Sequence, residues 1–127
     1  MSRPTPAQCR IVDERDGRCC SVCGMSLTGV PASRHHRLMR SHESDPKRLH
    51  RASNLIDVCG SGTTGCHGWI HAHPDTAYRL GLLVHAWEDP EKTPMLRYAG
   101  MLGESQWVLL DDQGDVTAVD PEEWGQP

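Results

Sequence analysis

The alternation of hydrophobic and polar positions predicts an N-terminal helix followed by a pair of short strands. Residues 5–18 carry apolar side chains at loose helical spacing behind Thr5, a residue suited to cap a helix. Residues 33–39 and 54–58 have the length and apolar content of strands. The polar, basic residues 40–53 between them indicate an exposed loop.

The second half of the chain predicts helix first and strands afterwards. Residues 67–80 have a helical pattern, interrupted at Pro74, which cannot continue a preceding helix but suits the first turn of the next. Strands are expected at residues 82–86, 107–110 and 115–119, the last two joined by a turn at 111–114. The expected fold class is α+β, with residues 1–81 as the main part and residues 82–127 as a short β-rich extension of the same compact unit.

Composition narrows the class of protein. A chain of 127 residues with 37% hydrophobic positions suits one small domain, and no apolar run is long enough to span a membrane. We expect a soluble, cytoplasmic protein without membrane contact. Six cysteines in such a protein favour metal ligands over disulfides, and eight histidines strengthen that preference. The four tryptophans, Trp69, Trp87, Trp107 and Trp124, are interpreted as core or interface residues.

The charge is unevenly distributed along the chain. Residues 1–80 hold 11 Lys or Arg and seven Asp or Glu, whereas residues 81–127 hold two and ten, which gives the net charge of -4. The basic part suits a polyanion, and the acidic part argues against DNA wrapping around the whole molecule. A loop that neutralises phosphates would explain the basic side chains between residues 34 and 51, although a merely solvated loop is the alternative. These side chains are Arg34, Arg37, Arg40, Lys47, Arg48 and Arg51.

Two cysteine pairs predict a structural zinc site. Four thiolates meet the tetrahedral preference of Zn²⁺, and they are supplied here by Cys20, Cys23, Cys59 and Cys66. Cys19 could replace Cys20, but Cys20 gives the usual two-residue gap, so Cys19 and Cys9 are interpreted as small core residues. The alternatives are ordinary buried cysteines or a disulfide-exchange enzyme with a reactive thiol at Cys20 or Cys23.

Four histidines form a second candidate site. His67 and His71 are four residues apart, which on a helix places both imidazoles on one face, within reach of one metal ion. His73 could substitute for His71, but it lies off that face. His35 and His36 are adjacent on a predicted strand and should point to opposite faces, so one can bind a metal while the other accepts a proton.

The order of these groups resembles a known family. His35-His36-Arg37, then Asn54-Leu55-Ile56, then Cys59 and Cys66-His67-x3-His71, resemble the HNH endonucleases, in particular small zinc-containing HNH proteins of tailed phages. The resemblance covers roughly residues 9–81 and departs from the family in the six-residue gap between Cys59 and Cys66. It implies a ββα-metal core (HNH, His-Me finger), in which a hairpin and a helix hold one divalent ion beside the four-cysteine zinc site.

The resemblance also assigns roles to individual residues. It implies that His36 is the general base, that Asn54 fixes the orientation of this base, and that the ligands of the catalytic ion are His35, His67 and His71. The implied cofactors are structural Zn²⁺ and one catalytic Mn²⁺, Mg²⁺, Ni²⁺ or Zn²⁺. Arg37, next to the base, is the first choice among the six basic residues for a phosphate contact.

The function implied is that of a metal-dependent DNA endonuclease that nicks or cleaves double-stranded DNA. Such phage proteins resemble partners of the genome-packaging machinery, which suggests the terminase large subunit and the portal as partners in the host cytoplasm. The acidic residues 81–127 would suit docking of such a partner. A monomer or weak dimer is expected. The alternative is a non-enzymatic, zinc-stabilised DNA-binding or adaptor module, in which the histidines are structural.

Overall fold

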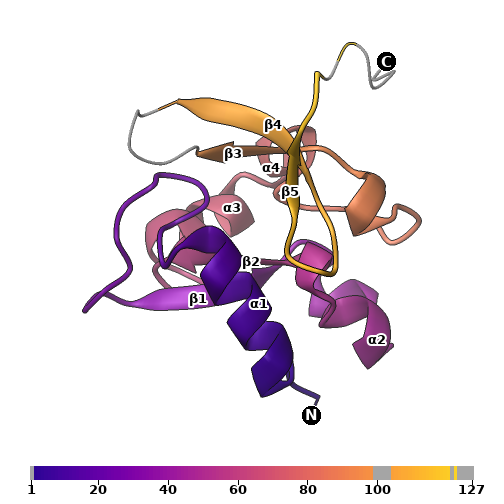
Figure 1. The fold of residues 1–127 in the computed structure, drawn as a ribbon, viewed down its shortest axis with the longest axis horizontal. Coiled ribbons are helices and arrows are strands. Elements are labelled where there is room, and N and C mark those ends of the chain that lie inside the picture. Colours follow the sequence, from indigo (N-terminus) through magenta and orange to yellow (C-terminus); the bar gives the residue numbers. More distant parts are fainter. Residues whose placement is uncertain (1, 99–103, 121, 123–127) are drawn as a thin grey trace.

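The structure, a computed structural model, describes residues 2–98, 104–120 and 122, and its class is α+β (Figure 1). Two antiparallel sheets are present: β1 (Ala32–His36) pairs with β2 (Leu55–Cys59), and a second sheet has the order β3 (Met95–Tyr98), β4 (Ser105–Leu110), β5 (Val116–Ala118). The α-helices are α1 (Pro6–Asp16), α2 (Pro46–Leu49), α3 (Gly65–Ala72) and α4 (Pro74–Arg79). Single 3₁₀ turns occur at Arg40–His42, Ala52–Asn54 and Pro90–Lys92. Each helix among the described residues is too short or too polar to cross a membrane.

Helix α1 begins and ends as its sequence predicts. Thr5 and Gln8 form a capping box, in which the Thr5 hydroxyl accepts from the Gln8 N–H and the Gln8 side chain accepts from the Thr5 N–H. Gly17 ends the helix with a φ of 62°, a conformation that glycine adopts without steric cost. The helix buries Val12 against Leu55 of β2.

Strand β2 is buried on both faces because it lies between α1 and α3 (Figure 1). Its side chains alternate, so Leu55 packs with α1 while Ile56 and Val58 pack in the larger core with Ile70 of α3. The pairing with β1 sets His36 opposite Leu55. This register fixes where the histidines at the end of β1 lie relative to α3.

The larger core joins both halves of the chain. Residues from β2, α3 and α4 pack with the segment after α4 and with the second sheet, and this cluster contains Ile56, Val58, Ile70, Ala77, Leu82, Leu83, Met95, Val108 and Leu110. Burial of each larger side chain in this cluster, Ala77 excepted, stabilises the domain by roughly 1.5–3 kcal/mol. Residues 82–120 therefore supply part of the core that supports the N-terminal part.

The C-terminal half differs from expectation in two places: one expected strand is absent, and one strand was not expected. Residues 82–86, expected to be a strand, form turns after α4: the N–H groups of Leu82 and Leu83 both bond the Ala77 carbonyl, and the Val84 N–H bonds the Arg37 carbonyl. Leu82, Leu83 and Val84 are buried as in a strand, but their N–H groups bond α4 and Arg37 instead of a neighbouring strand. Strand β3 was missed because its four residues lack clear alternation.

The expected exposed loop between β1 and β2 is also more ordered and more buried than its polarity indicates. Asp45 caps α2 by accepting from the Lys47 N–H, and Leu49, His50 and Ser53 are buried. Burial of polar side chains here is possible because each finds a partner; Ser53, for example, donates its hydroxyl to Asp112.

Arg37 is the clearest departure from the sequence prediction. Its side chain is fully buried, and its guanidinium donates to four backbone carbonyls, those of Ser53, Gly81, Pro90 and Thr93, at 2.8–3.1 Å. Burial lowers the pKa of Arg37 to about 9. The expectation that Arg37 contacts phosphate is therefore wrong for this conformation, because the guanidinium already holds together segments that lie far apart in the chain.

Replacing Arg37 by methionine is expected to destabilise the fold. Arg37→Met leaves four buried carbonyls without their donor, which should lower the free energy of unfolding by about 3 kcal/mol or more. Urea denaturation measures this change, and the exposed Arg40→Met is the matched control, with an expected change within about 0.5 kcal/mol. Equal stability of the two variants would contradict the structural role of Arg37.

Asp57 carries a stability cost that depends on pH. Its side chain is buried beside Asp13 and Asp16, and burial, a hydrogen bond to Asp13 and the charge of Asp16 raise the pKa of Asp57 from 3.8 to about 8. The unfolded chain loses this proton near pH 4, whereas the folded chain keeps it until about pH 8. Between these values the folded state binds more protons, so this group lowers the free energy of unfolding as the pH rises.

Asp57→Asn is expected to remove this dependence, because asparagine cannot ionise and its amide can donate in place of the carboxyl hydroxyl. The variant should melt several degrees above the wild type at about pH 8.5, with a smaller gain at about pH 5. Calorimetry of both proteins at the two pH values measures the difference, and comparison with the wild type cancels other titrating groups. A gain that does not grow with pH would count against a protonated Asp57.

Candidate metal centres and active-site cavity

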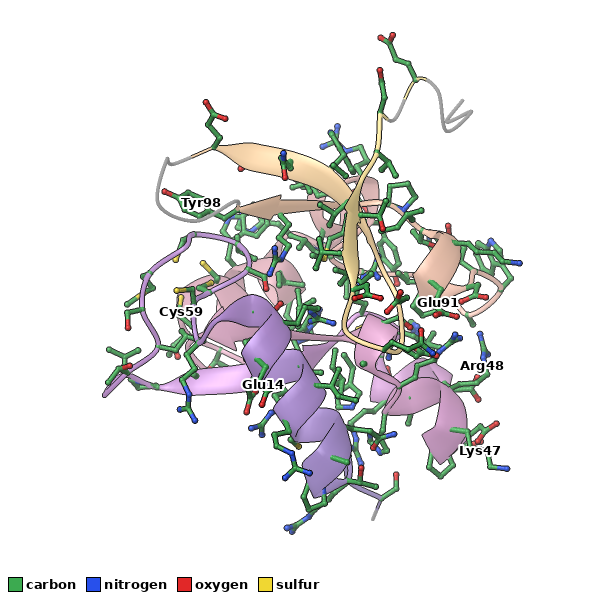
Figure 2. The ribbon with its side chains drawn as sticks, in the orientation of Figure 1. Glu14, Lys47, Arg48, Cys59, Glu91 and Tyr98 are labelled. Carbon is green, nitrogen blue, oxygen red and sulfur yellow. The ribbon has the colours of Figure 1, made fainter. Side chains whose placement is uncertain are left out.

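The four cysteines predicted to bind zinc lie together. One sulfur from each of Cys20, Cys23, Cys59 and Cys66 lies within 4.8 Å of the others, and the sulfurs of Cys23 and Cys59 are 3.9 Å apart. A tetrahedron with Zn–S bonds of ~2.3 Å has edges of about 3.8 Å. Figure 2 shows sulfur atoms gathered around Cys59, where β2 ends. The cluster therefore has the composition and size of a four-thiolate metal site such as zinc.

Local backbone geometry brings these cysteines together. The backbone N–H of Cys23 bonds the sulfur of Cys20, and that of Cys66 bonds the sulfur of Cys59, so each pair forms a turn that favours thiolates. Gly24 has a φ of 78° and faces the ring of Tyr98 so closely that a Cβ atom would lie 2.1 Å from it. The first cysteine turn therefore packs directly on β3, as the position of Tyr98 in Figure 2 shows.

The alternative ligand Cys19 lies outside the cluster. Its thiol is directed to the Gly17 carbonyl at 3.5 Å, and its backbone bridges to Ser26.

Burial raises the pKa of Cys66, which in the absence of a cation opposes its ionisation. A bound divalent cation reverses that preference, because coordination favours the thiolate.

Serine substitutions at the adjacent residues Cys19 and Cys20 are expected to show which of the two is a metal ligand. Cys20→Ser removes a cluster sulfur and should lower both zinc content and melting temperature, whereas Cys19→Ser should retain about one equivalent of zinc. Atomic emission spectroscopy of the purified variants measures the metal content. Loss of zinc in both variants, or in neither, would be inconsistent with a site built on Cys20.

The three histidines predicted to bind a catalytic ion also lie together. One ring nitrogen from each of His35, His67 and His71 lies within 4.8 Å of the other two. The Nε2 atoms of His67 and His71 are 3.2 Å apart, and Nδ1 of His67 is buried without a partner among the described residues. These imidazoles present more ring nitrogens than the protein's own hydrogen bonds use, which suits metal ligation.

His35 is oriented by the C-terminal half of the chain. Its Nε2 lies 2.8 Å from the Leu82 carbonyl, and since a carbonyl only accepts, Nε2 carries the proton and Nδ1 keeps a lone pair. Burial lowers the pKa of His35 to about 3, so the ring stays neutral. A hydrogen bond of this kind from the non-ligating nitrogen is typical of metal-binding histidines. Residues 82–127, expected to be a β-rich extension, thus also orient a histidine of this cluster through the Leu82 carbonyl.

His36 shares a cavity with the three clustered histidines. The cavity has a volume of about 310 Å³ and is lined by Arg34, His35, His36, Met39, Arg40, Ser41, His67 and His71. Burial, followed by the nearby His50 and Arg40, lowers the pKa of His36 to about 4, so its ring is neutral at neutral pH. The arrangement places a neutral imidazole, able to accept a proton, beside a candidate metal site. The expected alternative His73 lies outside the cluster, stacked on Trp69 at the start of α4.

Asn54 is buried, but its side chain does not hydrogen-bond His36, the residue it was expected to orient. Its side-chain oxygen accepts from the Leu38 N–H at 2.7 Å, and its amide donates to the carbonyls of Leu38 and Leu49. No hydrogen bond joins Asn54 to His36; the ring nitrogen of His36 instead faces His50, at 3.1 Å. Sequence reasoning missed His50, because a histidine in a polar, basic stretch gives no signal of burial.

The remaining basic residues divide into paired and unpaired groups. Arg34 binds Asp13, Arg48 binds Glu43, and Arg51 binds three acids, Asp89, Glu91 and Asp112. Figure 2 shows Lys47 of α2 pointing away from the protein. Within the described parts of the chain, Arg40 and Lys47 form no ion pair. The expected phosphate-binding set is thus reduced to Arg34, Arg40 and Lys47, with Arg34 already bound to a carboxylate.

The tryptophans, which were expected to be core or interface residues, differ in exposure. Trp87 is 81% exposed, with its ring stacked on His85, which in turn stacks on Tyr78. Trp69 is 37% exposed, Trp107 is partly buried in β4, and Trp124 lies outside the described residues. Trp69 and Trp87 are therefore surface residues of this chain.

Comparisons with protein-family models, with curated proteins and with solved structures find no match to this chain. The functional argument therefore depends on the geometry of the two clusters and of the cavity.

Proposed function

We propose that the chain is a metal-dependent DNA endonuclease of the HNH type, in which β1, β2 and α3 form the ββα-metal core. The observation that carries this proposal is the shared cavity of His36 and the cluster of His35, His67 and His71. A hydrolase of this class needs a neutral base and a cation site close together, with access for a phosphate. A purely structural histidine site would not need a fourth histidine beside it.

The chain's own residues suit this chemistry. His36 is neutral at cellular pH because its pKa is lowered to about 4, so it can take a proton from a water molecule that attacks phosphorus. His35, His67 and His71 would hold the ion, with His35 directed by the Leu82 carbonyl. A divalent ion bound there would supply positive charge to the scissile phosphate and to the leaving 3′ oxygen. Three protein ligands suit a catalytic site, because further positions stay open.

Basic side chains near the cavity support DNA as the substrate class. Arg34 and Arg40 line the cavity, and Lys47 extends from the neighbouring α2. These cations would contact phosphates without reading bases, which predicts weak sequence preference. Four cysteines are proposed to hold structural Zn²⁺, and the catalytic ion is proposed to be Mn²⁺, Mg²⁺, Ni²⁺ or Zn²⁺.

The resemblance of the motif order to phage HNH proteins leads us to propose a role in genome packaging, with the terminase large subunit and the portal as partners. Exposed acidic side chains of the C-terminal half suit docking of a protein and would repel DNA. They include Glu104, Asp115, Asp120 and Glu122.

Metal-dependent nicking of supercoiled plasmid tests the proposed activity. The zinc-containing protein, treated with a mild chelator, is incubated with plasmid and added Mn²⁺, Mg²⁺ or Ni²⁺. We expect open-circular product, and we expect His36→Ala to lower its rate by about 10²- to 10⁴-fold with folding intact, because the proton acceptor is lost.

His42→Ala is the matched control, since His42 is an exposed histidine outside the cavity lining. It should nick at the wild-type rate. Absence of product with every ion, or equal rates for His36→Ala and the wild type, would reject the endonuclease and leave a zinc-stabilised DNA-binding or adaptor module as the function.

A further inference from the structure

His50 forms a buried connection to the proposed base. Its Nδ1 lies 3.1 Å from Nε2 of His36, and the two rings meet edge-on with centroids 5.2 Å apart. On its other side, Nε2 of His50 lies 3.0 Å from the hydroxyl of Ser2. Only 2% of His50 is exposed, so water competes little for these contacts. The three residues form one chain of hydrogen bonds that ends at the cavity.

The hydrogen bond between the two rings couples the tautomer of His36 to that of His50. Two imidazole nitrogens can bond only when one carries a proton and the other a lone pair. If Nε2 of His36 is the donor, its Nδ1 keeps the lone pair and is the nitrogen that accepts a proton from water. His50 then accepts at Nδ1 and donates from Nε2 to the Ser2 hydroxyl, so both ring nitrogens of His50 have a partner.

The backbone around His50 is held by Asn54. The Asn54 amide donates to the carbonyl of Leu49, which precedes His50, and to that of Leu38, two residues after His36. Its oxygen accepts from the Leu38 N–H. The N–H of His50, which ends α2, bonds the carbonyl of Pro46, the first residue of that helix. One buried amide therefore joins the two backbone segments that carry the interacting rings.

We propose that His50 is a positioning residue that holds His36 in the tautomer and orientation of a base, and that Asn54 acts on His36 through His50. The inference rests on the proposed endonuclease function and deepens it. When the attacking water forms its bond to phosphorus and the bond to the 3′ oxygen breaks, the water's proton passes to Nδ1 of His36. The proton on Nε2 stays on His36, and the His50 lone pair stabilises the resulting imidazolium.

Two amide variants separate this role from simple packing. The side-chain amide of His50→Asn lies at the position of Nδ1 and can still bond His36, whereas that of His50→Gln lies at the position of Nε2 and can bond only Ser2. We expect His50→Asn to nick plasmid within about threefold of the wild-type rate, and His50→Gln to lose about 10- to 100-fold in kcat with KM unchanged. Melting temperatures and zinc content monitor the fold.

Nitrogen NMR of the His36 ring in the zinc-containing protein reports its tautomer independently of activity. The wild type and His50→Asn should show the proton on Nε2, and His50→Gln should show a mixture of tautomers. A fixed tautomer that depends on His50, in a wild-type protein that does not nick DNA, would support the positioning role and reject the endonuclease. Equal kcat for His50→Gln and the wild type, or equal losses in both amide variants, would overturn the inference while leaving the endonuclease in place.

Discussion

The adjacency of Cys66 and His67 at the start of α3 is the constraint on which both candidate centres depend. Cys66 joins the cysteine cluster and His67 joins the histidine cluster, so one helix start belongs to both. The register of β1 with β2 supplies the other partners: Cys59 lies at one end of the pair, opposite Ala32, and His36 lies at the other, opposite Leu55. A shift of one residue in this pairing would exchange the two faces that the strands present to α1 and α3, and would separate His35 from α3. Fixing the cysteine turn therefore also fixes the geometry of the histidines.

Backbone carbonyls from the C-terminal half also hold the side chains of His35 and Arg37 in place. The carbonyl of Leu82 accepts from His35, and those of Gly81, Pro90 and Thr93 accept from Arg37. These groups lie in the segment that follows α4, which contributes Leu82 and Leu83 to the core. A histidine whose free nitrogen is fixed by a buried carbonyl loses little orientational freedom when it binds a metal. The acidic half of the chain thus contributes to the site through its backbone, whatever its charged side chains bind.

The sequence predicted the clusters better than their surroundings, for physical reasons. Thiolate pairs and the four-residue spacing of His67 and His71 are local patterns, so these ligands followed from spacing, whereas the choice of His35 over His36 came only from the resemblance to HNH endonucleases. The first helix and the two strands of the first sheet followed from capping residues and short apolar runs. The burial of Arg37 depends on carbonyls 16 to 56 residues away in the chain, and that of His50 on contacts with His36 and Ser2. Neither the burial of Arg37 nor that of His50 is therefore indicated by a local sequence pattern.

The basic residues between positions 34 and 51 are also involved in holding the fold together. Arg51 bonds Asp89, Glu91 and Asp112, and Arg48 donates to the carbonyls of Ala86 and Glu88, so these cations hold the C-terminal half against the loop between the strands. A charge that is already paired contributes less counterion release on binding DNA. Among the six basic residues of this segment, Arg40 and Lys47 form no ion pair with described residues; Arg40 lines the histidine cavity, and Lys47 lies in α2. Contacts within the fold therefore leave this segment with fewer unpaired cations than its sequence suggests, because most of its arginines already bind carboxylates or backbone carbonyls.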